Sequence, residues 1–409
     1  MSIIVYSIPA FFILIGVELI IARMRNSQLY RMNDAITNLN CGITQQVLGI
    51  FFKVFTVGIY AYIYEHWRLV EHMPVAWYTW IILLVGVDFF YYWFHRLSHE
   101  IAVLWGTHVV HHQSEEYNLS VALRQSAIQT FGSLWFYLPL AFIGFDPVTF
   151  VTIASIQTVY QFWIHTRLIK KMPAWFEYIF NTPSHHRVHH GVNPKYIDRN
   201  HGGTFIIFDR MFGTFQAEEE EVHYGVTKPL NSWNAIWSNF DYYKDLGNIL
   251  KQTKNAKDFV LVLVKEPGWQ PDYLGGPVKP QEISPDRKLY DAQSTSKMHI
   301  YILMQFLLLL GITSGFLFGL EQFDAAQQIL LAGYIILTTI NMGGLFENKS
   351  WARFSEVLRL LALAPVGYFL MKEPQPIFLI ILLIFTVLSV VHFATACHKK
   401  QNSLNTGII

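Results

Sequence analysis

The sequence is poor in charge and in cysteine. Only 14% of its 409 residues are Asp, Glu, Lys or Arg, whereas soluble globular chains carry about 25%. The net charge of +1 gives no indication of a nucleic-acid partner. Its two cysteines, Cys41 and Cys397, are far apart and lie in or beside apolar segments, so they predict neither a disulfide framework nor a thiolate metal site. Any bound metal must therefore use nitrogen and oxygen ligands.

Long hydrophobic stretches are abundant instead. Hydrophobic residues make up 52% of the chain, and the mean hydropathy is +0.29, which indicates a membrane protein. Stretches that approach the roughly 20 apolar residues needed to cross a bilayer occupy 3–22, 46–64, 76–94, 299–320, 327–345, 356–371 and 376–396. The apolar segment 127–164 is broken by "GFDP" and predicts a helical hairpin that either spans or re-enters the membrane. We expect an all-α polytopic membrane protein with about nine membrane helices.

Basic residues near the segment ends predict the orientation. Cytoplasmic loops are enriched in Lys and Arg, and nine crossings with the N-terminus outside bring most of these residues to one side. They are Arg23, Arg25, Arg31, Arg96, Arg167, Lys170, Lys171, Arg353, Lys399 and Lys400. Lys53, Arg68 and Lys372 are exceptions. We expect the first group of residues to face the cytoplasm.

The stretch 166–297 is polar, and its run "EEEE", Glu218–Glu221, is typical of a solvated loop. It is too long for a connector and too polar to span, so it predicts a cytoplasmic cap. We expect N-terminal membrane helices over 1–75, a catalytic core with its cap over 76–297, and a four-helix membrane region over 298–409.

Eleven of the 17 histidines lie between His95 and His201. "HRLSH" ends the third apolar segment with two histidines four residues apart. "HVVHH" and "SHHRVHH" each place three at i, i+3 and i+4, which face one side of a helix. His165 ends the hairpin, at the same expected depth as His95. The candidate ligands are His95, His99, His108, His111, His112, His165, His186, His189 and His190.

Metal binding explains this pattern better than a pH sensor, which needs only a few histidines that become charged near pH 6. Zinc is satisfied by three or four ligands, whereas these nine imidazoles supply four or five to each of two metals. No HExxH motif provides the general base of a zinc protease. Imidazole-rich sites with an open position suit redox iron. We therefore predict a two-iron centre where the third and fifth crossings leave the bilayer, so that a lipid substrate can remain in the membrane.

The pattern "HRLSH…HVVHH…HHRVHH", within about residues 80 to 220, resembles the fatty acid hydroxylase and sterol desaturase superfamily. This resemblance implies a membrane oxygenase that uses dioxygen at two metals. "HHQSEEYNLSVALRQS", "NTPSHHRVHHG" and "GTFIIFDRMFGTF" are most similar to its alkylglycerol monooxygenase (glyceryl-ether monooxygenase) family, as are the four later spans.

That resemblance implies hydroxylation of the ether-linked carbon of an alkylglycerol, with tetrahydrobiopterin as electron donor, and release of a fatty aldehyde. Glu100 matches the family's glutamate after the first histidine pair and is a candidate catalytic residue that tunes the site or contacts a cofactor. His201 stands where an aromatic residue, usually tyrosine, is expected; it is either a hydrogen-bond partner or a neutral replacement.

Three alternatives remain open. One is another lipid hydroxylase or desaturase of the superfamily, acting on an acyl chain or sterol with a pterin or a redox protein as donor. A second is a zinc-dependent membrane hydrolase. The third is a transporter or lipid-binding protein with structural metals, against which the later spans are expected to contain no buried acidic residue. The sequence does not specify the lipid, the oligomeric state, or the host membrane, which is the plasma membrane in a bacterium and the endoplasmic reticulum in a eukaryote.

Overall fold

The computed structural model describes residues 3–279, 284, 287–292, 294–371 and 376–397. These residues form fifteen α-helices and contain no β-strand beyond two isolated bridges, Phe180–Phe205 and Gly191–Tyr224. The all-α prediction is therefore confirmed. Lys372, Lys399 and Lys400, which were part of the orientation argument, lie outside the described residues.

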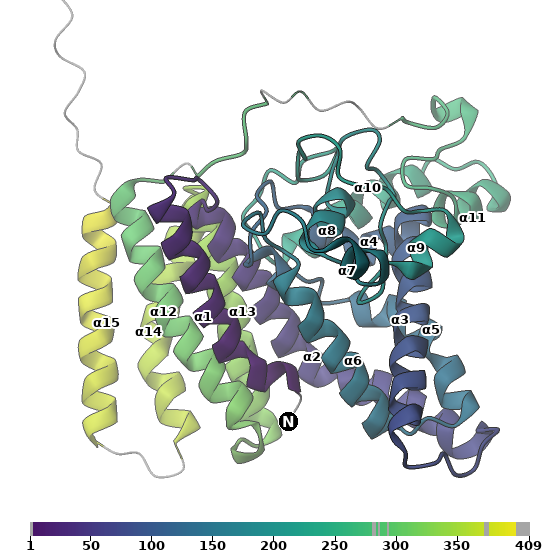
Figure 1. The fold of residues 1–409 in the computed structure, drawn as a ribbon. Helices are drawn as coiled ribbons and strands as arrows, with labels where there is room; N and C mark the ends of the chain where they lie inside the picture. The colour runs from purple at the N-terminus through teal and green to yellow at the C-terminus, as the bar shows by residue number, and fades with distance from the viewer. Residues whose placement is uncertain (1–2, 280–283, 285–286, 293, 372–375, 398–409) are drawn as a thin grey trace, which may run out of the picture. The chain divides into compact units, whose positions relative to one another are not determined.

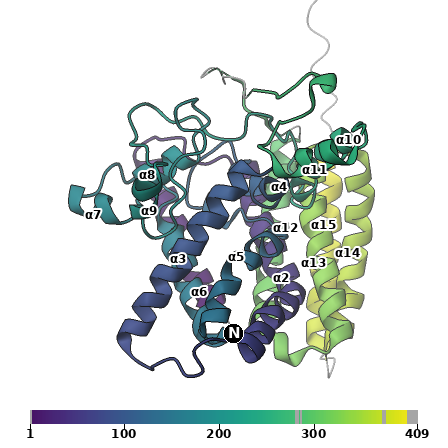
Figure 2. The ribbon, with the colours of Figure 1, turned by 90° about the vertical axis from the view of Figure 1, so that its right-hand side faces the viewer.

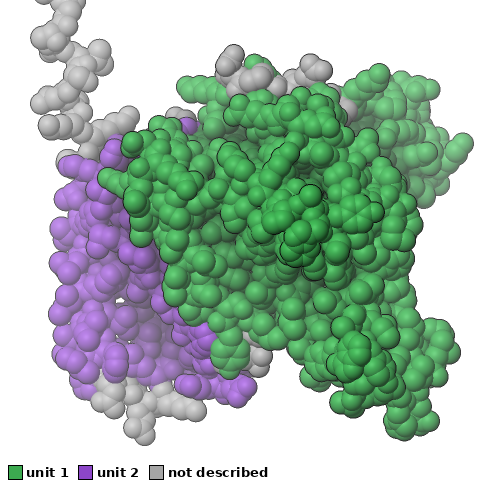
Figure 3. All heavy atoms as spheres, viewed as in Figure 1, with its two compact units in different colours: residues 1–290 green, residues 291–409 purple. Residues whose placement is uncertain are grey.

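The chain divides into two compact units, residues 1–290 and 291–409 (Figure 3). The first unit contains all nine candidate ligands. Its helices are α1 (Ile3–Met24), α2 (Met32–Trp67), α3 (Trp77–Glu100), α4 (Ala102–His112), α5 (Gln129–Ile143), α6 (Pro147–Trp163), α7 (Ala174–Ile179), α8 (Pro183–His189), α9 (Ile207–Phe212), α10 (Asp241–Leu250) and α11 (Ala256–Val264).

The short helices of the first unit gather at one end of its long ones. Helices α4, α8 and α9 lie beyond or beside the C-terminal end of α3 in both views (Figures 1 and 2). Helix α3 contacts α4, α5 and α6, while α2 contacts α5 and α1 contacts α6. This arrangement brings the histidine-bearing segments together at the ends of the long helices.

The hairpin predicted over 127–164 consists of α5 and α6. Gly144 lies between them with φ +124°. A Cβ atom there would come within 2.4 Å of the main-chain oxygen of Val70, so this position requires glycine. Asp146 caps α6 by accepting hydrogen bonds from the N–H groups of Val148 and Thr149, and Pro147 occupies the first turn. The "GFDP" turn is confirmed.

Six described helices are long and apolar enough to cross a membrane: α1, α2, α3, α12 (Ser296–Phe318), α13 (Ala325–Phe346) and α15 (Pro376–Cys397). The other three segments of the predicted nine are also helical. However, α5 and α6 have only 15 and 17 residues, which at 1.5 Å per residue is roughly 22–26 Å, short of a 30 Å hydrocarbon core. Helix α14 (Ser350–Leu370) carries Arg353, Glu356 and Arg359.

The second unit is built from α12, α13, α14 and α15, and its core is polar at one point. Glu356 and Arg359 of α14 are 2% and 1% exposed and are joined at 2.6 and 2.8 Å. Arg359 also donates to the Tyr334 hydroxyl of α13 and to Gln305 Oε1 of α12, and Gln305 donates to Ser389 of α15. The expectation that the later spans contain no buried acidic residue is therefore wrong. Because every helix contributes and both charges are paired, the cluster serves to join the helices.

Replacing Arg359 with methionine is expected to destabilise the second unit by about 3–5 kcal/mol, because it leaves Glu356 buried without its cation. Thermal unfolding in detergent, followed by fluorescence, measures the effect. The double change Glu356→Gln with Arg359→Met removes both charges and should recover most of the loss. A single Arg359→Met variant as stable as the native chain would contradict this role.

Candidate metal centre

The local fold of the histidine boxes follows the sequence. Helix α3 continues to Glu100, so His95 and His99 lie one turn apart with ring centroids separated by 5.4 Å. Ile101 is extended (φ −120°, ψ 119°), which ends α3 and lets α4 begin in a new direction. Pro183 occupies the first turn of α8, where its missing N–H is not needed.

The structure brings all nine candidate ligands together in two adjacent groups. In each group, one nitrogen per ring lies within 4.8 Å of those of the other members. Group one contains His95, His99, His108, His112 and His189, and group two contains His111, His165, His186 and His190. The groups touch, since the ring centroids of His112 and His190 are 4.5 Å apart. All nine rings are buried.

Both three-histidine boxes are shared between the groups. In the box on α4, the i, i+4 pair His108 and His112 belongs to group one, and His111 belongs to group two. In the box at α8 the roles are reversed, because His186 and His190 belong to group two and His189 to group one. The prediction of one common face for each box was too simple. Each box instead ties the two groups together.

The outward Nδ1 atoms of several rings are held by main-chain carbonyls. The Nδ1 atoms of His95, His111, His165 and His189 donate to the carbonyl oxygens of His201 (2.7 Å), Arg124 (2.9 Å), Gln161 (2.8 Å) and Arg199 (3.0 Å), respectively. A carbonyl only accepts, so Nδ1 must carry the hydrogen in each ring. The neutral ring then leaves Nε2 with a lone pair, which points inward. Such outer partners orient and strengthen imidazole ligands.

Two of these inward lone pairs face each other. The Nε2 atoms of His111 and His165 are 3.2 Å apart, and the Nδ1 hydrogens of both rings are already donated to carbonyls. Neither Nε2 of the neutral rings can donate to the other. Burial holds the pKa of His111 to about 4 and that of His165 well below 6.5, which disfavours a proton between them. A metal cation at this position converts a repulsive contact into coordination, so the donor set fits a metal ion.

Three further rings are neutral for the same reason. Burial, with the neighbouring imidazoles as a second cause, holds the pKa values of His112, His186 and His190 well below 6.5. Neutral imidazole is the form that binds metals. Neither group includes a carboxylate, so the centre differs from carboxylate-bridged sites.

A short segment after α8, residues 198–201, orients three members of group one. Asp198 Oδ1 lies 3.4 Å from His99 Nδ1, and the carbonyls of Arg199 and His201 accept from His189 and His95. Sequence reasoning named only His201 in this segment and did not find the roles of Asp198 and Arg199. Its acceptors are mainly carbonyls, which leave no signal in residue identity.

Two buried carboxylates hold the chain that follows this segment. Asp209 accepts from the N–H groups of His201 (2.7 Å) and Gly202 (2.8 Å). Asp88 of α3 accepts from Thr204 N–H (2.6 Å), from Phe205 N–H (2.9 Å), and from the Gln157 side chain of α6. The loop is therefore fixed to two long helices of the first unit.

Gly203 lies directly against Gln157 and Asp88, which help to hold this loop. A Cβ atom there would come within 2.5 Å of Gln157 Nε2 and 2.7 Å of Asp88 Oδ1. Gly203→Ala is therefore expected to displace the loop and to weaken metal retention in group one by about 10–100-fold. Metal content after dialysis against a chelator measures this. Gly247→Ala in α10, where no heavy atom lies within 4 Å, is the control; equal retention in both variants would argue against the orienting role.

An arginine within the histidine box at α8 holds the chain next to group two. Arg187, 3% exposed, makes a two-point contact with Glu218 at 2.7 and 2.6 Å. It also donates to the carbonyls of Thr166, Ile169 and Lys170, which follow His165. The solvated-loop prediction for the glutamate run is wrong for Glu218, because the buried guanidinium needs a counter-ion. It holds for Glu219 and Glu220, whose side chains are 57% and 45% exposed.

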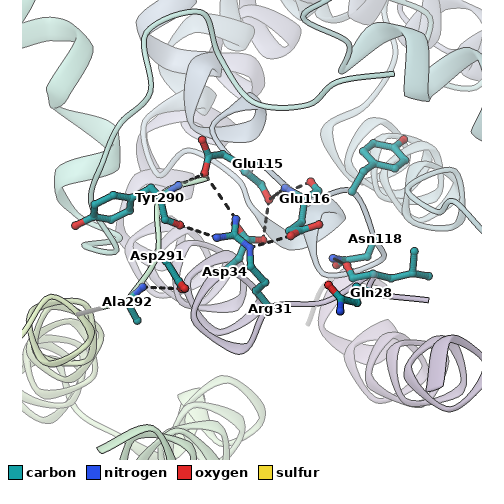
Figure 4. A network of polar contacts seen from close by, with 12 residues as sticks. Gln28, Arg31, Asp34, Glu115, Glu116, Asn118, Tyr290, Asp291 and Ala292 are labelled. Carbon is teal, nitrogen blue, oxygen red and sulfur yellow. Dashed lines mark hydrogen bonds and ion pairs between the residues drawn. The ribbon is translucent and has the colours of Figure 1, made fainter. Parts of the chain in front are cut away.

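Other polar residues near the boxes stabilise the scaffold. Glu115 and Glu116, just after α4, surround Arg31 of the segment before α2 (Figure 4). Glu115 also accepts from Tyr290 N–H. Asn118, in the same loop, donates to the Leu29 carbonyl. Arg124 acts through its carbonyl on His111 and not through its side chain.

Glu100 and His185 lie outside both groups. Glu100 pairs with Arg96 one turn earlier on α3 at 2.8 Å, and its side chain is 39% exposed. Its catalytic role stays a prediction. The ring of His185 stacks edge-on against Phe215, with centroids 5.5 Å apart.

Two protein families match the chain in comparisons with known proteins. The fatty acid hydroxylase family matches residues 80–214, and the alkylglycerol monooxygenase C-terminal domain matches residues 298–384. No solved structure matches.

Curated relatives cover most of the chain. It is 40% identical over 353 residues to an alkylglycerol monooxygenase from Xenopus tropicalis. The aligned region covers 86% of this chain and 79% of that protein. It is 37% identical over 406 residues to one from Danio rerio, with 96% and 90% covered. It is 36% identical over 356 residues to one from Homo sapiens, with 86% and 80% covered.

Proposed function

This chain belongs to the alkylglycerol monooxygenase family, and we propose that its nine grouped imidazoles hold two iron ions for the hydroxylation of an ether lipid. The observation that carries the proposal is the pair of inward lone pairs on His111 and His165, a repulsive contact that a cation would turn into coordination. Iron is bound well by imidazole, and its redox chemistry with dioxygen fits a monooxygenase. When bound, two irons would supply the redox chemistry that passes electrons from an external donor to dioxygen.

The proposed reaction inserts one oxygen atom into a C–H bond. An alkylglycerol, dioxygen, two electrons and two protons give water and an alkylglycerol hydroxylated on the ether-linked carbon. This product is a hemiacetal, and its C–O bond breaks to release a fatty aldehyde and glycerol. We propose tetrahydrobiopterin as the donor of the two electrons, on the basis of the family.

The chain's part is to orient the imidazoles and to exclude water. Carbonyl oxygens hold the outer nitrogens of four rings, so the ligands keep their direction during turnover. The burial of all nine rings limits access of bulk water. Positioning of this kind is the protein's share of cofactor chemistry.

An apolar groove on the first unit supports a substrate with a long chain. It lies along α2 and α5 and is lined by Ile63, Trp67, Trp135, Leu138, Pro139 and Phe142. Helix α5 begins at Gln129, whose Oε1 atom is 3.2 Å from His108 Nδ1. The groove residues of α5 therefore begin about 9 Å along the helix from Gln129, a distance that an alkyl chain spans.

We further propose that the nine apolar helices cross or enter the membrane, with the histidine groups on the cytoplasmic side. The short helices α5 and α6 then form the hairpin, and residues 166–297 form the cap. The domain division is membrane helices over 1–75, a catalytic core over 76–297 and a membrane region over 298–409. Basic residues such as Arg96 and Arg167, at the ends of α3 and of the hairpin, support this orientation.

Product analysis with purified, iron-loaded protein tests the function. We expect a long-chain alkylglycerol to yield fatty aldehyde only in the presence of both dioxygen and tetrahydrobiopterin. The ester analogue of the same chain length is the control. Oxygen-dependent hydroxylation or desaturation of other lipids, without aldehyde from the ether, would contradict the substrate. Activity with zinc and without oxygen would contradict the whole proposal and favour a hydrolase.

A further inference from the structure

His201 lies in the segment between α8 and α9, beside group one. Its side chain is fully buried. Its ring centroid is 5.2 Å from that of His99, and 5.6 Å from those of His95 and His189. Within group one, the ring centroids of His95 and His189 are 4.3 Å apart and those of His108 and His189 are 6.5 Å apart. The His201 ring therefore borders group one, although its nitrogens lie outside the 4.8 Å limit that joins the five members.

The nitrogens of this ring are without hydrogen-bond partners. Neither Nδ1 nor Nε2 of His201 makes a hydrogen bond within the described residues; the main chain of Asp198 makes only a polar contact outside hydrogen-bond geometry. The Nε2 atoms of His99 and His189 also have no partner, and these are rings that flank His201. Folded proteins leave few buried polar atoms unsatisfied, and each costs about 1–3 kcal/mol. One ligand between the three rings would satisfy a nitrogen of each.

The surrounding chain keeps the His201 ring neutral and in place. Burial, followed by the nearby His99, holds its pKa well below 6.5, so a lone pair is available. The preceding residue, Asn200, has φ +57°. Its side chain is bonded to the carbonyls of His185 and Gln216 and to the Gln216 N–H. The main chain of His201 is fixed by Asp209 and by its bond to His95.

We propose that His201 is a tenth metal-facing imidazole, which binds the ion of group one together with His99 and His189. This inference rests on the metal centre proposed above. With His201, six imidazoles would face the ion of group one and four would face that of group two, so exchangeable positions would be expected at group two. His201 thus makes the two metal positions unequal.

Cobalt(II) provides a test that does not depend on turnover. The full-length protein is loaded with cobalt, and its visible spectrum and loss of metal to a chelator are recorded. The same is done for His201→Phe and for His201→Tyr, both of which replace the imidazole with another aromatic ring. We expect both variants to release one of two ions at least about tenfold more readily. We also expect stronger visible absorption as group one loses a ligand.

The control is His185→Phe, the same change at a buried histidine outside both groups, which should behave as the native chain. Chelator curves and spectra of the His201 variants that match the native ones would overturn the proposal. Because the native chain is titrated alongside, failure of the metal centre is recognised separately: the native chain itself would then bind no cobalt.

Discussion

His111→Ala is expected to lower turnover at least about 1,000-fold and to leave the protein with one metal ion in place of two. His111 is central to group two, since its Nε2 atom lies 3.2 Å from that of His165 and 3.1 Å from that of His190. A catalytic metal stabilises a transition state by several kcal/mol, and about 4 kcal/mol corresponds to that loss. Turnover and metal content are measured on the same sample.

His189→Ala makes the matching change in group one and should give a similar loss. His223→Ala, outside both groups, is the control that should retain activity and both ions. If either ligand variant kept full activity with unchanged metal content, that histidine would be removed from the ligand set.

Arg187→Met is expected to destabilise the first unit by about 3–5 kcal/mol, because it leaves the Glu218 carboxylate without its cation. It also removes the donors that hold the chain after His165. The box residues His186 and His190 flank Arg187, so group two should lose its metal before group one does. Thermal unfolding in detergent and the metal remaining after chelator treatment measure the two effects.

Arg187→Lys separates charge from geometry. It keeps the charge toward Glu218 but cannot reproduce the planar two-point contact together with three carbonyl acceptors, so we expect partial recovery of stability and little recovery of metal retention. Lys195→Met, at an exposed lysine that pairs with Glu219 and Glu220, should change nothing measurable. An Arg187→Met variant with native stability and native metal content would show that Arg187 has no role in the centre.

The sequence was sufficient to find the nine imidazoles, because their spacing is a local property of helices. It was not sufficient to assign each imidazole to one of the two groups. His111 and His112 are adjacent, and successive residues of an α-helix point about 100° apart, so they reach different neighbours. Which neighbour each reaches depends on where α3, α6 and α8 lie, and that is a long-range property.

The supporting contacts were hidden for a related reason. The carbonyls of Arg124, Gln161 and Arg199 act whatever the side chain is, so residue identity does not reveal them. Glu218 looked like its neighbours in an acidic run, although only it is paired with a buried arginine. The buried Glu356 of α14 was missed because three helices and Arg359 are needed to make its burial tolerable.

The most direct test of the central claim is the iron content and Mössbauer spectrum of protein purified with ⁵⁷Fe, taken before and after exposure to oxygen with tetrahydrobiopterin and an alkylglycerol. The account predicts two irons per chain in unequal nitrogen environments, with dioxygen consumed in equal amount to the fatty aldehyde released. Protein that held zinc, or a single iron, and still cleaved the ether at the full rate would contradict it.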